Sequence, residues 1–204
     1  MPDDPVIPNH HRDFPRFSGV RGLLAAASMT LGRDGDARVA AELGRVGTHD
    51  VVVDVGSGPG AAARYAARLG ASVTGVDPAP VMLRVARGLT RSRKVRYVEG
   101  AVEALPLPDD FATVVWSLAT VHHWRDVDDG LREVRRVLRP GGRFVAIERR
   151  ILPDAAGLAV HGWTDEQADA FARACTDHGF TEVCVERPQQ TGRRSIIAVA
   201  ASAQ

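Results

Sequence analysis

The sequence predicts a doubly wound α/β fold, in which a mostly parallel sheet is covered by helices on both faces. Three observations predict it. Short apolar runs alternate along the chain with segments of helical periodicity. The first run, Val51–Val55, is apolar almost throughout, which is typical of strands buried on both faces of a parallel sheet. Repeated strand–helix units require right-handed crossovers, and these place helices on both sides of the sheet.

The remaining elements follow in order. The predicted strands are short runs rich in β-branched residues, and after residues 51–55 they cover residues 72–76, 95–98, 113–117 and 144–148. The predicted helices each present one apolar face. They cover residues 36–45, residues 60–69, a segment containing Val81, Met82, Val85 and Leu89, and a segment containing Val127, Leu131, Val134 and Leu138 that Pro140-Gly141-Gly142 should end.

The C-terminal part of the chain predicts a helix followed by a hairpin. Thr164 and Gln167 form a T-x-x-Q capping box, which predicts a helix that runs to His178 and is capped by Gly179. Two β-rich runs follow at residues 181–186 and 195–200, with turn residues at 188–192 between them. The hairpin should place one antiparallel strand at or near the edge of the sheet.

Composition limits the domain organisation and the partners. With 204 residues, 45% of them hydrophobic, we expect one domain over residues 36–204. The proline-rich residues 1–35 should form a partly irregular arm, either disordered or folded over a ligand site. The net charge of +1 gives no general attraction to nucleic acid or membrane, and the two cysteines suit a reducing, cytoplasmic setting. We therefore expect a small-molecule partner, and the oligomeric state stays open.

The sharpest motif is the segment 54–60, Asp-Val-Gly-Ser-Gly-Pro-Gly, between the first strand and its helix. Glycines let the backbone approach a ligand closely, and the helix behind them offers free N–H groups. Asp77 ends the second strand 21 residues after Gly56. Doubly wound folds place a carboxylate at this point to bind the ribose hydroxyls of a nucleoside.

The spacing of the glycines and the acid before them indicate which nucleoside is bound. The dinucleotide fingerprint is G-x-G-x-x-G, whereas this motif is G-x-G-x-G, one residue shorter. Asp54 precedes Gly56 by two residues. Its carboxylate would repel a pyrophosphate but suits the ammonium and sulfonium charges of S-adenosyl-L-methionine (SAM). The motif therefore favours SAM over a nicotinamide dinucleotide.

At this point the chain resembles a known family, the class I SAM-dependent methyltransferases of the UbiE-like, methyltransferase 11 type. The resemblance covers roughly residues 48–150 and consists of five stretches in family order, at residues 51–60, 74–83, 100–108, 114–124 and 131–148. It implies a Rossmann-like, seven-stranded sheet with a reversed terminal strand. It also implies an enzyme that transfers a methyl group from SAM to a small molecule.

The same resemblance assigns the cofactor residues. It places Asp54, Gly56, Ser57 and Gly58 around the methionine part of SAM and Asp77 on the ribose. The remaining cofactor residues are Pro78, Met82, Ala101, Val102 and Ser117, of which the first four surround the adenine. Members usually carry an aspartate where this chain has Ala101, so one polar adenine contact is expected to be missing. Glu103 either replaces it or is an exposed loop acid.

His122 and His123, in the segment that follows the fourth strand, are the predicted catalytic residues. They fall at the carboxyl edge of the sheet, and histidine is the natural base for removing a proton from a hydroxyl near neutral pH. His123 is slightly favoured. The alternative is that they bond to the backbone or shape the pocket. No metal site is expected, because no third ligand is evident.

The acceptor is expected to be a hydroxyl on a small polar compound, with a carbohydrate as the favoured class. The predicted substrate residues are Trp124, Glu148, His161 and Trp163, of which the two tryptophans could stack on a sugar face. Glu148 could instead pair with an arginine. The remaining histidines show no convergent partner in the sequence and are expected at the surface: His10, His11, His49 and His178.

Two other functions stay open. One is a non-catalytic SAM-binding module, which Ala101 and the lack of a long substrate-capping insert allow. The other is a nicotinamide-dependent oxidoreductase, against which the glycine spacing and Asp54 argue. Comparing the binding of SAM and NAD separates the second from the rest, and turnover separates the enzyme from the module.

Overall fold

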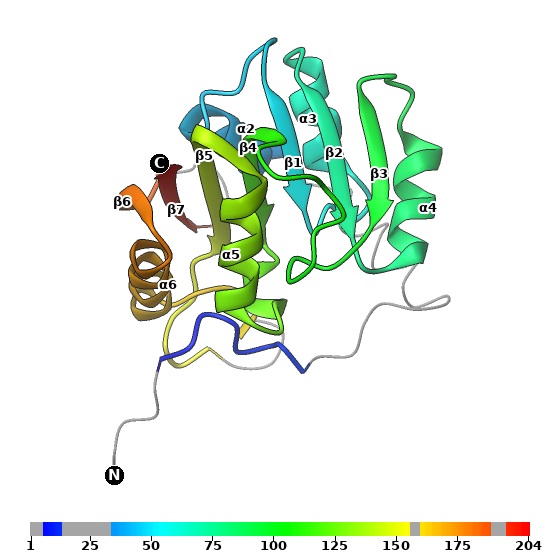
Figure 1. The fold of residues 1–204 in the computed structure, drawn as a ribbon. Helices are drawn as coiled ribbons and strands as arrows, with labels where there is room; N and C mark the ends of the chain where they lie inside the picture. The colour runs from blue at the N-terminus through cyan, green and yellow to red at the C-terminus, as the bar shows by residue number, and fades with distance from the viewer. Residues whose placement is uncertain (1–5, 14–33, 156–159, 189–194) are drawn as a thin grey trace.

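Seven strands form one mixed sheet in the computed structural model, with the order β3-β2-β1-β4-β5-β7-β6 (Figure 1). The structure describes residues 6–13, 34–155, 160–188 and 195–204. The strands are β1 Val51–Val55, β2 Ser72–Asp77, β3 Val95–Glu99, β4 Ala112–Leu118, β5 Leu138–Arg149, β6 Phe180–Glu186 and β7 Ile196–Ala203. The helices are α2 Asp34–Leu43, α3 Ala61–Arg68, α4 Pro80–Leu89, η1 Val121–His123, α5 Val127–Val137 and α6 Asp165–Asp177.

The strand pairing confirms the doubly wound sheet and its reversed strand. Strands β3, β2, β1, β4 and β5 are parallel neighbours, so their carboxyl ends meet at one edge. Strand β7 lies antiparallel between β5 and β6, with Val199 opposite both Ala146 and Val185. The reversed strand therefore lies next to the edge of the sheet, and β6 forms the edge itself.

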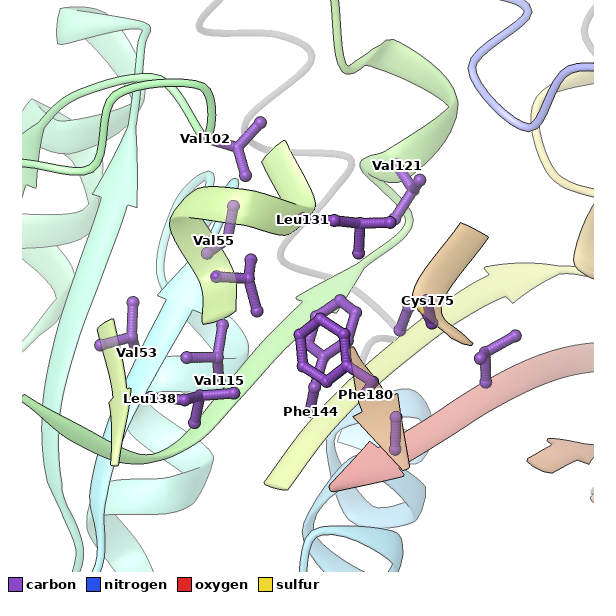
Figure 2. Close-up of a cluster of buried hydrophobic side chains, with 14 of the residues drawn as sticks. Val53, Val55, Val102, Val115, Val121, Leu131, Leu138, Phe144, Cys175 and Phe180 are labelled. Carbon is purple, nitrogen blue, oxygen red and sulfur yellow. The ribbon is translucent and has the colours of Figure 1, made fainter. Parts of the chain in front are cut away.

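Each face of the sheet has its own apolar core. Along β4, Val115 enters the core under α5 and α6, whereas Val114 and Trp116 enter the core under α2 and α3. In the first core, shown in Figure 2, the rings of Phe144 and Phe180 pack with their centroids 5.6 Å apart. Helices thus cover both faces, as the apolar runs predict.

The start of β5 and the end of α4 differ from the sequence prediction in ways that packing explains. Helix α5 ends at Val137, and β5 begins at Leu138 rather than near residue 144. The reason is a backbone pairing of Leu138 with Ala112, which carries the strand through Pro140-Gly141-Gly142 with an irregularity in the ladder. On α4 the side chain of Leu89 is 51% exposed and does not join the apolar face, because the helix ends there beyond the core.

Other predictions fall partly outside the described residues. The turn expected at 188–192 lies mostly there, and so does most of the arm expected at 1–35, so the division of the chain at residue 35 stays a prediction. Among the helices of the described ranges, none combines the length and apolarity needed to cross a bilayer.

The capping box of α6 is present and gives a testable prediction. The Gln167 N–H donates to Thr164 Oγ1 at 3.2 Å, and the Thr164 N–H donates to Gln167 Oε1 at 2.9 Å. Thr164→Ala is expected to lower the free energy of unfolding by about 1 kcal/mol, measured by urea denaturation. Thr176→Ala is the control, because Thr176 is an exposed residue of the same helix whose hydroxyl donates to the carbonyl of Ala172 and caps no helix end. Equal effects of the two variants would contradict the cap.

Candidate functional site

The glycine loop joins β1 to α3 in a backbone shape that favours glycine. Gly56, Gly58 and Gly60 have φ angles of 69°, 51° and 79°, in the left-handed region. The N–H groups of Gly56 and Ser57 both donate to the carbonyl of Val76, at 2.8 and 3.0 Å. The loop is therefore fastened to the end of β2, beside Asp77.

The three glycines differ in what surrounds them. A Cβ at Gly56 would lie 2.5 Å from Thr120 Cγ2, and a Cβ at Gly60 would lie 2.0 Å from the Tyr97 hydroxyl. A Cβ at Gly58 would meet no atom of the described structure within 4 Å. Packing therefore requires Gly56 and Gly60, whereas Gly58 faces open space from which a ligand could approach.

This contrast predicts unequal effects of two matched substitutions. Gly60→Ala is expected to lower the free energy of unfolding by about 2–4 kcal/mol, because it adds a collision with Tyr97 to the strain of a positive φ. Gly58→Ala should cost only about 1 kcal/mol, from the backbone term alone. Chemical denaturation measures the free energy of unfolding of both variants. Similar losses would show that the Tyr97 side chain moves aside and that the predicted collision does not occur.

Asp77 has a structural role that the sequence did not indicate. Its side chain is buried, and its two carboxylate oxygens accept hydrogen bonds from the N–H groups of Gly58 and Ala79, each at 2.8 Å. Burial raises the pKa of the carboxyl group, and the bonds from Ala79 and Gly58 oppose this. The predicted ribose ligand thus also holds the glycine loop.

A small open hollow lies in front of the glycine loop. Asp54, Gly56 and Ser57 line it together with Asp36 of α2, which sequence reasoning missed because α2 precedes the motif by many residues. The Ser57 hydroxyl is buried and has no hydrogen-bond partner within the described residues. Because buried polar atoms are almost always satisfied, this hydroxyl is available to bond to a ligand or a water molecule. A buried carboxylate and an unsatisfied hydroxyl suit the charged amino-acid end of SAM.

The predicted adenine residues lie beyond Asp77. Met82 and Val102 are buried and Pro78 is partly exposed, while Ala101 forms an isolated bridge with Ala104. Glu103 does not face this region as a free acid. Its carboxylate accepts the N–H of Arg125 at 2.7 Å, before the start of α5, because that backbone donor has no partner in the helix.

The end of β4 is braced against the glycine loop. The Ser117 hydroxyl is buried and lies 2.5 Å from Thr120 Oγ1, which also bonds to the carbonyl of Val55 at 3.3 Å. Ser117 was expected to contact the cofactor, but in this structure its hydroxyl bonds to Thr120. The sequence analysis did not single out Thr120, whose one sequence signal is its place two residues after the end of β4.

His122 and Glu148 form a buried pair at the same edge of the sheet. His122 Nδ1 lies 2.8 Å from Glu148 Oε2, and the two side chains are 4% and 0% exposed. The backbone N–H of His122 also donates to Glu148 Oε1, at 3.4 Å. Glu148 was expected to bind substrate or an arginine. It bonds to a histidine rather than to an arginine, because β5 ends beside the chain that follows β4, and its substrate role stays a prediction.

His123 is less deeply placed and is a weaker base. Its Nδ1 lies 3.3 Å from the carbonyl oxygen of His11. Burial and the nearby ring of His122 lower the pKa of His123 to about 4. Its imidazole is therefore neutral throughout the range from about pH 5 to pH 9.

The N-terminal strap, residues 6–13, corrects the prediction that His10 and His11 are isolated surface residues. The strap, drawn in blue, runs across the end of the molecule beside α5 (Figure 1). The rings of His10 and His11 pack against one another at 4.4 Å and against the ring of His122 at about 6 Å. Together with His123 and His161 they form what we call the histidine cluster. Of the other two, His49 is exposed, and His178 pairs with Asp128 at 3.5 Å.

The two tryptophans do not occupy the positions expected of them. Trp163 is fully buried, and its Nε1–H donates to the carbonyl of Pro8 at 2.7 Å. Trp124 is 4% exposed and meets the ring of Phe171 edge-on at 5.9 Å. The large apolar area of an indole ring favours this burial. Neither ring offers an open face to a sugar, so the stacking prediction finds no support.

Comparisons with known proteins agree with this arrangement. Residues 53–146 match the family model of a methyltransferase domain, Methyltransf_11. A malonyl-[acyl-carrier protein] O-methyltransferase of Pseudescherichia vulneris is 37% identical over 105 residues, which are 50% of this chain and 41% of that protein. A demethylmenaquinone methyltransferase of Tropheryma whipplei (strain Twist) is 34% identical over 113 residues, 54% of this chain and 46% of that protein. The match thus spans less than half the length of these relatives.

The fold is also found in a solved structure. A SAM-dependent methyltransferase from Aquifex aeolicus superimposes with a TM-score of 0.71 at 19% identity, over 89% of this chain and 98% of that one. At this identity the likeness concerns the fold, and it confirms the predicted sheet.

Proposed function

The chain contains a class I SAM-dependent methyltransferase domain of the methyltransferase 11 family, and from this premise we propose that it methylates a hydroxyl group of a small molecule with His122 as the base. The observation that carries the proposal is the buried His122–Glu148 pair. His122 lies in the segment after β4, and Glu148 lies at the end of β5. Both are at the edge of the sheet where the glycine loop follows β1. Parallel strands bring these groups to one edge, where ligands of such folds bind.

The glycine-loop side of the site would hold the cofactor. Asp54 and Ser57 would contact the amino-acid end, Asp77 the ribose, and Pro78 with Val102 the adenine. When bound, SAM supplies a methyl group on a sulfonium, which is already a good leaving group. Much of the acceleration would therefore come from aligning the acceptor oxygen and excluding water.

The His122–Glu148 pair would take the proton of the acceptor. A carboxylate accepts a hydrogen bond, so His122 Nδ1 carries the hydrogen and Nε2 keeps its lone pair. Nε2 would remove the hydroxyl proton as the new bond from oxygen to carbon forms. The positive charge on the ring would then face the carboxylate of Glu148, which acts as a positioning residue.

His123 supports the same chemistry less well, although the sequence slightly favoured it. A base works best when its pKa is close to the working pH, and the pKa of His123 is lowered to about 4. His122, held by a carboxylate, is therefore the better candidate. His123 would shape the pocket and exclude water.

The choice of oxygen rests on the histidine pair and on one relative. The Pseudescherichia protein is named an O-methyltransferase, whereas the Tropheryma protein is named for demethylmenaquinone. The carbohydrate class depended on tryptophan stacking, and both rings are buried. The proposal therefore retains a hydroxyl acceptor without that class.

A screen with methyl-labelled SAM tests the proposal. Full-length protein is incubated with a panel of sugars, phenols, hydroxy acids, lipids and RNA, and labelled products are identified by mass spectrometry. Labelled small hydroxy compounds support it, and label only on nitrogen, lipid or RNA contradicts it. Calorimetry with SAM and NAD gives the matching control, because tighter binding of NAD would contradict SAM as the cofactor.

A further inference from the structure

Five of the seven histidines gather in one place although they come from three distant segments. The closest rings are His122 and His123, whose centroids are 4.1 Å apart. His11 stacks on His161 at 4.4 Å with an angle of 15° between the ring planes. His11 and His161 also lie 5.8 and 5.9 Å from His122. The rings thus form one continuous group around the proposed base.

The strap is fastened by specific contacts, so its two histidines are held in position. Asn9 is buried, and its Nδ2 donates to the carbonyl of Trp124 at 3.1 Å. The His11 N–H donates to the carbonyl of His122 at 2.8 Å. Trp163 Nε1 bonds to Pro8, as described above. These bonds tie the strap both to the chain after β4 and to the chain before α6.

The charges in the cluster disfavour protonation of several rings at once. Burial and the charges of His10, His161 and His122 lower the pKa of His11, and burial with His122 lowers that of His123. The carboxylate that the structure joins to the cluster is Glu148, which is bound to His122. The strap itself ends in the exposed Arg12–Asp13 pair. An additional anion would therefore stabilise the protonated rings around it.

We infer that the histidine cluster binds an anionic group of the methyl acceptor, a carboxylate or a phosphate. The inference rests on the proposed function, because it names the substrate class of the same site. His10, His11, His123 and His161 are partly exposed, whereas His122 is 3% exposed. His10 already bonds through both ring nitrogens, to the carbonyl of Val160 and to Gln167, and so fixes the strap. The other outer rings would donate N–H groups to an anion at the rim when protonated, and the base lies beneath them. An acceptor that carries both a hydroxyl and an acidic group would be held by the base and the outer rings together.

Transition metals are the other common ligands of grouped imidazoles. Within the described residues, no group of three or more histidine, cysteine, aspartate or glutamate side chains is arranged to hold a metal ion. The stacked ring planes of His11 and His161 suit N–H donation at the rim better than convergence on one ion. The arrangement therefore favours an anion.

The test measures binding rather than turnover. Full-length protein with ¹⁵N-labelled histidine is titrated with 4-hydroxybenzoate, with its neutral counterpart 4-hydroxybenzamide, and with inorganic phosphate. At about pH 5 we expect the acid to bind about tenfold more tightly than the amide, and the NMR titration midpoints of His11 and His123 to rise by about one pH unit or more. The affinity for the acid should fall as the pH rises to about 8, because the bound anion promotes proton uptake and the rings are neutral there.

Matched variants localise the effect. His161→Gln should remove the preference for acid over amide, while His49→Gln, an exposed histidine outside the cluster, should keep it. A shift with phosphate alone would identify a phosphate group as the anion and also supports the inference. Equal binding of acid and amide, unmoved cluster titrations at saturating acid and phosphate, or a cluster that responds only to Zn²⁺ would overturn it. SAM affinity is measured on the same samples. A protein that binds SAM but does not prefer the acid contradicts only the anion site, whereas a protein that does not bind SAM contradicts the proposed function.

Discussion

Replacing Asp77 with alanine is expected to weaken SAM binding by about a hundredfold or more. A carboxylate that accepts bonds from two ribose hydroxyls makes charge-assisted contacts worth about 1.5–3 kcal/mol each. The same change releases the N–H groups of Gly58 and Ala79, which Asp77 holds at 2.8 Å. Isothermal calorimetry measures the affinity, and Glu99→Gln is the control, since Glu99 lies opposite Asp77 on β3 but is exposed.

The structure also changes what is expected for stability. From the sequence, a side chain at a strand end should be removable with little effect on folding. Because two buried N–H groups lose their acceptor, we expect Asp77→Ala to lower the free energy of unfolding by about 1–3 kcal/mol. Asp77→Asn keeps one carbonyl oxygen as an acceptor. Its SAM affinity and its free energy of unfolding should both lie between those of the unsubstituted protein and of Asp77→Ala. Unchanged SAM affinity in Asp77→Ala would show that the nucleoside site is misplaced.

Replacing His122 with alanine is expected to reduce turnover by about a hundredfold or more while SAM affinity is retained. His123→Ala should have a smaller effect, because its low pKa makes it a weak proton acceptor. Glu148→Gln should lower turnover by about tenfold or more and shift the pH–rate profile, because the imidazolium loses its carboxylate partner. Steady-state kinetics on an acceptor found in the labelled-SAM screen measures all three, with calorimetry of SAM as the control.

The pH dependence separates the two histidines. If His123 were the base, the acid limb of the rate profile would fall near pH 4, where its ring becomes protonated. Its lowered pKa also means that the unfolded chain binds this proton more readily than the folded chain. The contribution to stability is therefore present above about pH 6.5 and is lost as the pH falls towards 4. Near-normal turnover of both alanine variants between about pH 6 and pH 9 would contradict any histidine base.

The sequence by itself determined the sheet and the glycine loop beside Asp77, because local patterns encode both. The apolar run at Val51–Val55, the capping box at Thr164 and the hairpin at the end of the chain each reflect interactions between residues close in sequence, and the structure contains all three. The glycine motif likewise combines turn geometry with a strand before it and a helix after it. Its Asp77 partner could be found because strand and helix lengths fix the spacing of successive strand ends.

Only the tertiary structure decided which side chains meet around His122, the proposed acceptor side, because these contacts join segments far apart in the chain. Glu148 meets His122 since β5 pairs with β4, and no local pattern distinguishes a histidine partner from an arginine. The strap brings His11 to His161 through bonds such as that from Asn9 to Trp124, 115 residues away. Trp163 is buried by the same strap, through Pro8. Such pairings depend on packing between elements, where burial and hydrogen-bond satisfaction, rather than sequence spacing, select which side chains meet.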